Sequence, residues 1–525
     1  MVNCNNMKGI LALLYLCSVC SGSRILVFYP GVSGSLLLSF NPLFQELSRR
    51  GHELTVVTKI PLRDADKHNI TQVVIKRENN VEVFEVFKKL SFIPRIIYGW
   101  KGVISDCEKL FEIPEIKELM NAHDKYDLFI GSPYYFLECS IALAHHLRLP
   151  VLNIYSNRFS IHASHPGGHP NPLAYISELH LPFGDNMNLW KRTVNVVFNT
   201  AYAVGLSVYY LPPMARVVQR YFPDAPPLQD MLSRMPVSLV NTNIAIHHPQ
   251  PTLPGVIPVG GLTISGNQSL PQDLQAWMDE SDEGVILFSL GSNLKVSSLE
   301  YVKLKEILET FARLPQRVLM KWEGEKLPGK PDNVRSQKWI PQAAVLAHKH
   351  CRLFMTHGGL HSWEEAVYFG VPLLGLLPVF FDQEHNLDEM QGRGQGLYFS
   401  GPWSPGHLHA AIQEVLLNPK YKENLQKASK VLKDQPMRPL DTAVFWTEYV
   451  IRHRGATHLQ SSYSTIPWYQ LICLDVISVI IVFLSLVLWI VCTVLRALRQ
   501  CIVDYEYTIF NKILRLCYKV KKTNK

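Results

Sequence analysis

This sequence lacks the pattern of paired cysteines whose disulfides stabilise many small secreted proteins. Most of its ten cysteines lie in or beside apolar segments at the two ends: Cys4, Cys17, Cys20, Cys473, Cys492, Cys501 and Cys517. Only Cys107, Cys139 and Cys351 remain in the body of the chain. Because three is an odd number and the spacing is not that of metal ligands, the sequence supports neither a disulfide framework nor a zinc site.

Internal repeats with a period of about 20–50 residues are also lacking. A chain of 525 residues is too long for one ordinary core, so we expect two globular domains with appendages. The apolar fraction is 47% and the charged fraction only 18%, which fits a folded protein with a membrane part.

The first 22 residues have the pattern of a signal peptide. An apolar run over residues 10–19 follows a basic start at Lys8, and small residues come after it at Ser21 and Gly22. The run is too short to span a bilayer, and the small residues suit a signal peptidase.

The C-terminal region has the pattern of a single membrane span. Residues 476–495 form an uncharged stretch of 20 residues, long enough to cross the hydrocarbon core as a helix. The tail at 496–525 carries eight basic and two acidic residues, so it holds 8 − 2 = 6 of the net +8 charges. The basic balance therefore indicates a cytosolic tail on anionic lipid, and nucleic acid is not implied. We expect a type I protein whose membrane-proximal segment covers 451–475.

Two features indicate the endoplasmic reticulum membrane as the location. Asn69 and Asn267 begin sequons that a lumenal body would expose to glycosylation. The last five residues, KKTNK, resemble a dilysine retrieval signal, with the lysines one place too far from the end.

The body divides into two α/β halves. Residues 24–30 and 53–58 have the apolar, β-branched pattern of strands, and a helical pattern over 42–49 lies between them. This βαβ unit predicts a parallel sheet, and the pattern returns at 126–155. We expect a first domain at 23–248 and, after a punctuated zone at 247–261, a second doubly wound domain at 249–450.

The most informative stretch runs from Trp339 to Gln383. A strand pattern ends in His357-Gly358-Gly359, and a helical pattern follows. The glycines let a ligand approach the backbone, and the free N–H groups at the helix start suit a diphosphate, to which His357 can also donate. Taken singly, the glycine pair is explained equally well as a tight turn.

As a whole, this stretch resembles the signature of the UDP-glycosyltransferase family, in its animal, membrane-anchored (UDP-glucuronosyltransferase-like) type. The spacing agrees from Trp339 and Gln342 to Asp382-Gln383, and the resemblance extends to RGHELTVVT near the start and LDVI at the membrane entry. It implies two facing Rossmann-like, doubly wound domains of the GT-B type. The first would bind the acceptor, and the second would bind a UDP-sugar in the cleft between them.

The resemblance also implies roles for individual residues of the second domain. Trp339 would stack on the uracil, Gln342 would bond its edge, and Glu365 would take the ribose hydroxyls. The remaining site residues would hold the diphosphate (Ser292, Lys321, His357, Gly358, Gly359, Ser362) and the sugar hydroxyls (Asp382, Gln383). Lys321, His357 and the helix end would meet the phosphate charge, so we expect neither a metal nor another cofactor.

Four positions depart from the family pattern. Lys321 stands where many relatives carry arginine, and His361 replaces an asparagine. The family's catalytic histidine, sixteen residues before His52, corresponds to Leu36. The partner aspartate, five residues after Asp127, corresponds to Ser132. Neither side chain can act as the base or hold an imidazolium, so the pattern predicts UDP-sugar binding without the usual catalytic pair.

Three interpretations remain open. Another base could serve, the candidates being His162, His165, His169 and Glu138; or the acceptor could arrive already ionised; or the chain could be a non-catalytic UDP-sugar-binding relative. Losing a positioned base costs about 10²–10⁴ in rate while leaving binding intact. The apolar segments around Phe136 and Phe159 favour a small lipophilic acceptor. Self-association, or pairing with related chains in the same membrane, is left open.

Overall fold

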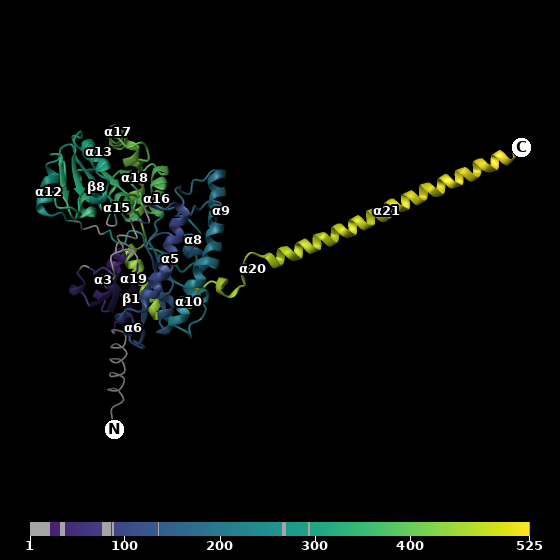
Figure 1. Cartoon of the computed structure of the whole chain (residues 1–525), viewed down its shortest axis with the longest axis horizontal. Helices are drawn as coiled ribbons and strands as arrows, with labels where there is room; N and C mark the ends of the chain where they lie inside the picture. Colours follow the sequence, from purple (N-terminus) through teal and green to yellow (C-terminus); the bar gives the residue numbers. More distant parts are fainter. Residues whose placement is uncertain are drawn as a thin grey trace, which may run out of the picture. The chain divides into compact units, whose positions relative to one another are not determined.

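The computed structural model describes residues 22–31, 37–62, 64–75, 86, 89–134, 136–264, 269–291 and 294–523. They fall into two compact units that divide after Ser461. The first unit contains both sheets, and the second contains the long C-terminal helix (Figure 1).

The first lobe is built on a parallel sheet of seven strands in the order β3-β2-β1-β4-β5-β6-β7. The strands are β1 (Arg24–Tyr29), β2 (Glu53–Thr58), β3 (Ile70–Val74), β4 (Leu128–Gly131), β5 (Val151–Tyr155), β6 (Ser238–Val240) and β7 (Val256–Pro258). The central strand β1 is buried almost end to end, as both faces of a parallel sheet are covered. The order reverses between β1 and β4, and a doubly wound sheet binds its ligands at the carboxyl ends of such strands.

Helices cover both faces of this sheet. Its helical elements are α3 (Asn41–Arg49), η1 (Ala65–Lys67), α5 (Phe92–Leu110), α6 (Pro114–Met120), α7 (Ser140–His146), α8 (Ile161–Gly167), α9 (Leu189–Gly205), η2 (Leu206–Tyr210), α10 (Leu211–Tyr221) and α11 (Leu228–Ser233). Side chains of α5, α7 and α10 share one hydrophobic core with the sheet, and α3 contributes to the core on the other face.

The second lobe has a parallel sheet of six strands in the order β10-β9-β8-β11-β12-β13. The strands are β8 (Val285–Ser289), β9 (Arg317–Lys321), β10 (Val334–Gln337), β11 (Cys351–Thr356), β12 (Leu373–Gly375) and β13 (Gly396–Tyr398). The helical elements are α12 (Gln272–Asp279), η3 (Val296–Ser298), α13 (Tyr301–Phe311), α14 (Gln342–Ala347), α15 (Leu360–Phe369), α16 (Phe381–Gly392), α17 (Pro405–Leu417) and α18 (Pro419–Lys433). The two expected doubly wound α/β domains are therefore both present.

The first lobe extends beyond the expected boundary at 248–249. Strand β7 lies after that boundary and pairs with β6. Helix α19 (Pro439–Arg452), which is followed by η4 (Thr457–Leu459), returns from the second lobe and packs beside α3 (Figure 1). Ala443, Val444 and Val450 of α19 are fully buried in the core of the first sheet. The end of the chain's body thus ties the second lobe back to the first.

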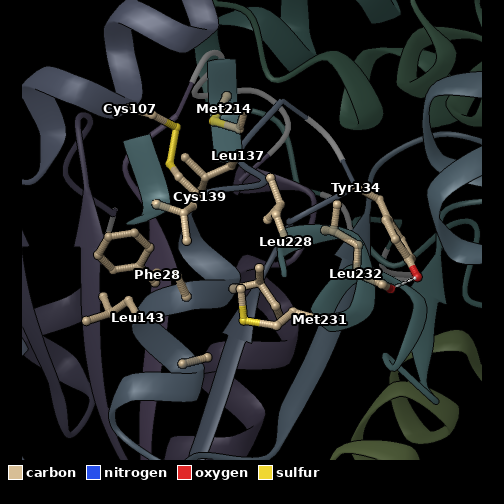
Figure 2. Close-up of a cluster of buried hydrophobic side chains, with 14 of the residues drawn as sticks. Phe28, Cys107, Tyr134, Leu137, Cys139, Leu143, Met214, Leu228, Met231 and Leu232 are labelled. Atoms are coloured by element: carbon tan, nitrogen blue, oxygen red, sulfur yellow. Dashed lines mark hydrogen bonds between the residues drawn. A yellow bond between two sulfur atoms is a disulfide. The ribbon is translucent and has the colours of Figure 1, made fainter. Parts of the chain in front are cut away.

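A disulfide joins Cys107 of α5 to Cys139 at the start of α7, in contrast to the expectation from the cysteine count (Figure 2). The bond lies in the core of the first lobe beside Leu137 and Met214, and Cys351 is left as a buried free thiol on the other sheet. The three cysteines of the body thus form one disulfide and leave one free thiol. The two cysteines are 32 positions apart, and only the packing of α5 on the first sheet brings them together.

Hydrogen bonds connect the two lobes near the carboxyl ends of their strands. Ser39 Oγ lies 2.8 Å from His361 Nε2, and Asn241 donates to Glu364 Oε2 at 3.2 Å. Further along, Arg158 Nη2 lies 2.7 Å from His385 Nε2. Residues of α15 and α16, among them His361, Glu364 and His385, therefore face the first lobe.

The second unit consists of η5 (Ser462–Thr465), α20 (Trp468–Leu471) and α21 (Leu474–Thr523). Two helical stretches among the described residues are long and apolar enough to cross a membrane, Leu189–Tyr221 and Leu474–Lys519. The first of these is part of the body, where α9 and α10 pack on the first lobe. The second contains the expected span at 476–495, and its helix continues through most of the predicted basic tail.

Candidate functional site

The glycine turn between β11 and α15 has the geometry that the sequence predicts. β11 ends at Thr356, and α15 begins at Leu360 after Gly359 as its N-cap. Gly358 has a φ of +86°, and a Cβ there would lie 2.6 Å from Leu387 Cγ and 2.8 Å from Gln383 O. Only glycine fits this backbone, and the turn leaves the N–H groups at the start of α15 without helical partners.

His357 is enclosed by glycines. A Cβ on Gly291 would lie 2.6 Å from His357 Cε1, and a Cβ on Gly359 would lie 2.8 Å from the same atom. Burial, with a smaller effect from the charge of Lys321, lowers the pKa of His357 to about 4. The imidazole is therefore neutral near pH 7 and has one N–H to donate.

Lys321 at the end of β9 and Trp339 in the loop after β10 lie close together. The Lys321 Nζ donates to the backbone oxygen of Gly291 and lies 5.7 Å from the centre of the Trp339 ring. Burial lowers the pKa of Lys321, and Glu323 opposes that shift. Trp339 is 55% exposed, so much of its indole surface is accessible to a planar ligand.

Three of the predicted residues meet between α14 and α15. Gln342 Nε2 donates to Glu365 Oε2 at 2.8 Å and to Ser362 Oγ at 3.3 Å. Burial raises the pKa of Glu365 to about 7, although the Gln342 hydrogen bond lowers it. The carboxyl is thus held in place with one oxygen engaged, in an environment where it titrates near neutral pH.

Asp382 and Gln383 lie in the first turn of α16. Gln383 Oε1 accepts hydrogen bonds from the N–H groups of Val379 and Phe380 at 2.7 and 3.1 Å, so this oxygen caps the helix. Only the amide nitrogen of Gln383 is left to reach a sugar. Burial raises the pKa of Asp382, while the charges of His180 and His361 lower it. Asp382 therefore lies in the field of histidines from both lobes.

The remaining predicted residues are placed less completely. Ser292, Asn267 and Leu36 lie outside the described residues. Asn69 is exposed just before β3. Ser132 follows β4 directly, where it is 1% exposed and lies beside the Tyr29 hydroxyl. Ser132 therefore lies at the carboxyl end of β4, and its correspondence to the family's acid stays a prediction.

The histidines considered as substitute bases differ in their surroundings. His162 is 2% exposed, and its two ring nitrogens lie 2.6 Å from Glu138 Oε1 and 3.1 Å from Tyr202 Oη. His165 Nε2 lies 2.9 Å from Ser207 Oγ. Both ring nitrogens of His169 are buried and have no hydrogen-bond partner among the described residues, and burial lowers its pKa to about 4.

Sequence reasoning missed the pair of His180 and Glu178. His180 Nδ1 lies 2.7 Å from Glu178 Oε1, in the loop between α8 and α9. The only signal in the sequence is a Glu-x-His spacing, which is too common to single out. His361 also has an unexpected role, because its ring bridges Ser39 of the first lobe and Glu364 of its own helix.

The fold and this cluster define a class, the two-lobed GT-B glycosyltransferases. The calicheamicin glycosyltransferase CalG4 is similar over 82% of this chain and 99% of its own, with a TM-score of 0.55 and 18% identity. The glycosyltransferase VinC, solved in complex with dTDP, gives a TM-score of 0.54 at 16% identity, over 82% of this chain and 98% of its own. At these identities the likeness concerns the fold alone.

Sequence comparison defines the family. The family model described as "UDP-glucoronosyl and UDP-glucosyl transferase" matches residues 24–507. UDP-glycosyltransferase UGT5 of Dactylopius coccus is 33% identical over 487 residues, or 90% of this chain and 92% of the relative. Human UDP-glucuronosyltransferase 2B10 is 30% identical over 497 residues, or 90% and 93%. The chain belongs to the UDP-glycosyltransferase family.

Proposed function

We propose that this chain is a membrane-anchored transferase that binds a UDP-sugar in its second lobe and transfers the hexose to a small lipophilic acceptor. The observation that carries the proposal is the meeting of Gln342, Ser362 and Glu365 beside the His357 turn. Gln342 lies on α14 and the other two on α15, and the three match the uracil, ribose and diphosphate in kind. The exposed indole of Trp339 adds a stacking surface.

We further propose that the diphosphate is bound without a metal. Lys321, His357 and the N-terminus of α15 supply a positive charge, a donor and a helix dipole. The one group of metal-ligand type among the described residues is Asp185, His248 and Glu389, whose ligand atoms lie within 4.8 Å of one another. Asp185 is paired with Arg158, and Glu389 is paired with Arg393 and His248. This group is satisfied as an ion-pair network between the lobes.

The location proposed is the endoplasmic reticulum membrane, with the body in the lumen and the basic tail in the cytosol. The apolar segment of α21 and the positive charges that follow it support this topology. The proposed partners are a UDP-sugar, a lipophilic acceptor and the bilayer. Self-association and pairing with related chains are left open.

A non-catalytic role as a UDP-sugar-binding relative is the second candidate. The observation that favours it is Ser132, a buried hydroxyl where the family places the acid that orients its base. The same fold would then bind the donor without deprotonating an acceptor, and the chain would act through its partners.

A screen of UDP-sugars and acceptors with microsomes that contain the full chain separates these functions. The proposed transferase forms a conjugate with the native sequence, and the variant carrying Leu36→His and Ser132→Asp forms it faster. The double variant Trp339→Ala/Glu365→Gln is the matched donor-site control and should lose the conjugate in either background. UDP binding without any conjugate would support the non-catalytic role, and absence of UDP binding would contradict both.

A further inference from the structure

We propose that His180, oriented by Glu178, is the general base that takes the acceptor proton in this chain. The inference rests on the proposed transferase function and assigns its missing chemical step. A hydroxyl acceptor needs a base within hydrogen-bond reach, and a useful base is itself held by a third group. The His180–Glu178 pair meets the second condition and faces the donor lobe.

Glu178 is fixed firmly enough to orient a histidine. Its side chain is 2% exposed, and its Oε2 accepts the N–H of Ile161 at the start of α8 at 2.8 Å. Its backbone N–H donates to Asn195 Oδ1 at 3.0 Å. The other carboxylate oxygen, Oε1, lies 2.7 Å from His180 Nδ1. A hydrogen on Nδ1 then points to Glu178, and the lone pair is on Nε2.

The other ring nitrogen of His180 is available. The side chain is 12% exposed, and within the described part of the chain Nε2 makes no hydrogen bond. The ring centre lies 5.3 Å from that of Phe381, the first residue of α16, and the neighbouring Asp382 interacts with the His180 charge. Asp382 is a predicted ligand of the donor sugar. The free nitrogen therefore lies at the edge of the cleft where a hexose would be presented.

Of the histidines proposed from the sequence, His162 and His169 fit this task less well. His162 also pairs with a carboxylate, Glu138, but Tyr202 occupies its second nitrogen and the ring is buried. His169 has no carboxylate to stabilise its protonated form, and burial opposes that form. In His180, Glu178 fixes Nδ1, and Nε2 is left to accept a proton.

Aromatic rings lie around His180. Phe92 of α5, Phe198 of α9 and Phe381 of α16 form a chain with centroid distances of 5.4 and 5.2 Å, and each is partly exposed. The His180 ring lies 6.1 Å from Phe198 and 5.0 Å from Tyr202. Such a surface suits a flat aromatic ring, so a phenol is the probe acceptor in the test below.

The step balances without a further reactant. His180 Nε2 takes the proton from the phenol hydroxyl, and the oxygen forms a bond to the anomeric carbon. The bond between that carbon and the phosphate oxygen breaks, and its electron pair leaves with UDP. The protonated imidazole, stabilised by Glu178, then releases its proton to water.

The test uses His180→Gln in full-length protein in membranes, because glutamine keeps a donor to Glu178 and cannot act as a base. We expect kcat for a weakly acidic phenol to fall by about 10²–10⁴. The affinity for the UDP-sugar and the unfolding temperature should stay within error. The loss should shrink for acceptors that are ionised at the assay pH. His123→Gln, at an exposed histidine of the same lobe, is the matched control and should keep kcat.

Glu178→Gln separates a positioning role from a structural one. For Glu178→Gln, kcat should fall while the KM for the UDP-sugar stays within error, because the group that orients the His180 ring is gone and the donor site is unchanged. Equal kcat in native protein and His180→Gln, with transfer present, would overturn the base and leave the proposed function standing. A native chain that binds UDP-sugar and transfers nothing would overturn both.

Discussion

The titration of Glu365 gives the sharpest prediction for donor binding. Burial raises the pKa of this carboxyl to about 7, and Gln342 engages one of its oxygens. Two vicinal ribose hydroxyls both need an acceptor, which the ionised form supplies and the protonated form supplies only in part. As pH falls through 7, the carboxylate gains a proton and the affinity for the ribose should fall.

The size of the effect follows from the pKa. At pH 5.5 only about 3% of a group with a pKa near 7 is ionised, so the Kd for UDP-glucose should rise roughly 30-fold between pH 8 and pH 5.5 if the ionised form alone binds. His361 acts in the opposite direction. Burial lowers its pKa, but the Glu364 hydrogen bond gives a net rise, and protonation of this ring adds a positive charge that favours the diphosphate.

Calorimetric titration with UDP-glucose measures this dependence, since the diphosphate diester itself does not titrate in this range. Glu365→Gln should weaken binding at pH 8 by about 1.5–3 kcal/mol, or roughly 10- to 150-fold, and abolish the loss toward low pH. If the variant binds as tightly as the native chain, or keeps the full acid loss, the ribose is not bound at Glu365.

Three further predictions concern other parts of the molecule. Trp339→Ala should weaken UDP binding by about 1–3 kcal/mol in the same titration, whereas Trp190→Ala on the exposed side of α9 should not; equal effects would argue against uracil stacking. Removing the disulfide with Cys107→Ala/Cys139→Ala should lower the free energy of unfolding by about 4 kcal/mol, for a separation of 32 residues, and an unchanged denaturation midpoint would contradict this. A chain ending at Ser461 should leave the membrane pellet on alkaline extraction, and retention there would place a second anchor in the body.

The sequence predicted the elements whose patterns are local. Residues 53–58 form β2 as expected, and the strand expected over 24–30 is β1, one residue shorter. The glycine turn was equally readable, because a positive φ at Gly358 leaves glycine as the only unstrained choice. The βαβ pattern expected at 126–155 is present as β4, α7 and β5.

What the sequence could not predict depends on contacts between distant segments. The return of α19 to the first sheet, the Cys107–Cys139 bond and the Ser39–His361 bridge all join positions that no local pattern relates. His180 and Glu178 are close in the sequence. Only the contact of His180 with Phe381, 201 positions further along the chain, shows that the pair lies beside the second lobe. The chemistry in the cleft therefore depends on residues of both lobes.

A structure of the full chain with UDP-glucose bound tests the central claim most directly. The account predicts uracil on Trp339, ribose hydroxyls at Glu365, the diphosphate at the His357 turn, and the hexose between Asp382 and His180 Nε2. A ligand bound elsewhere, or a hexose directed away from His180, would contradict it.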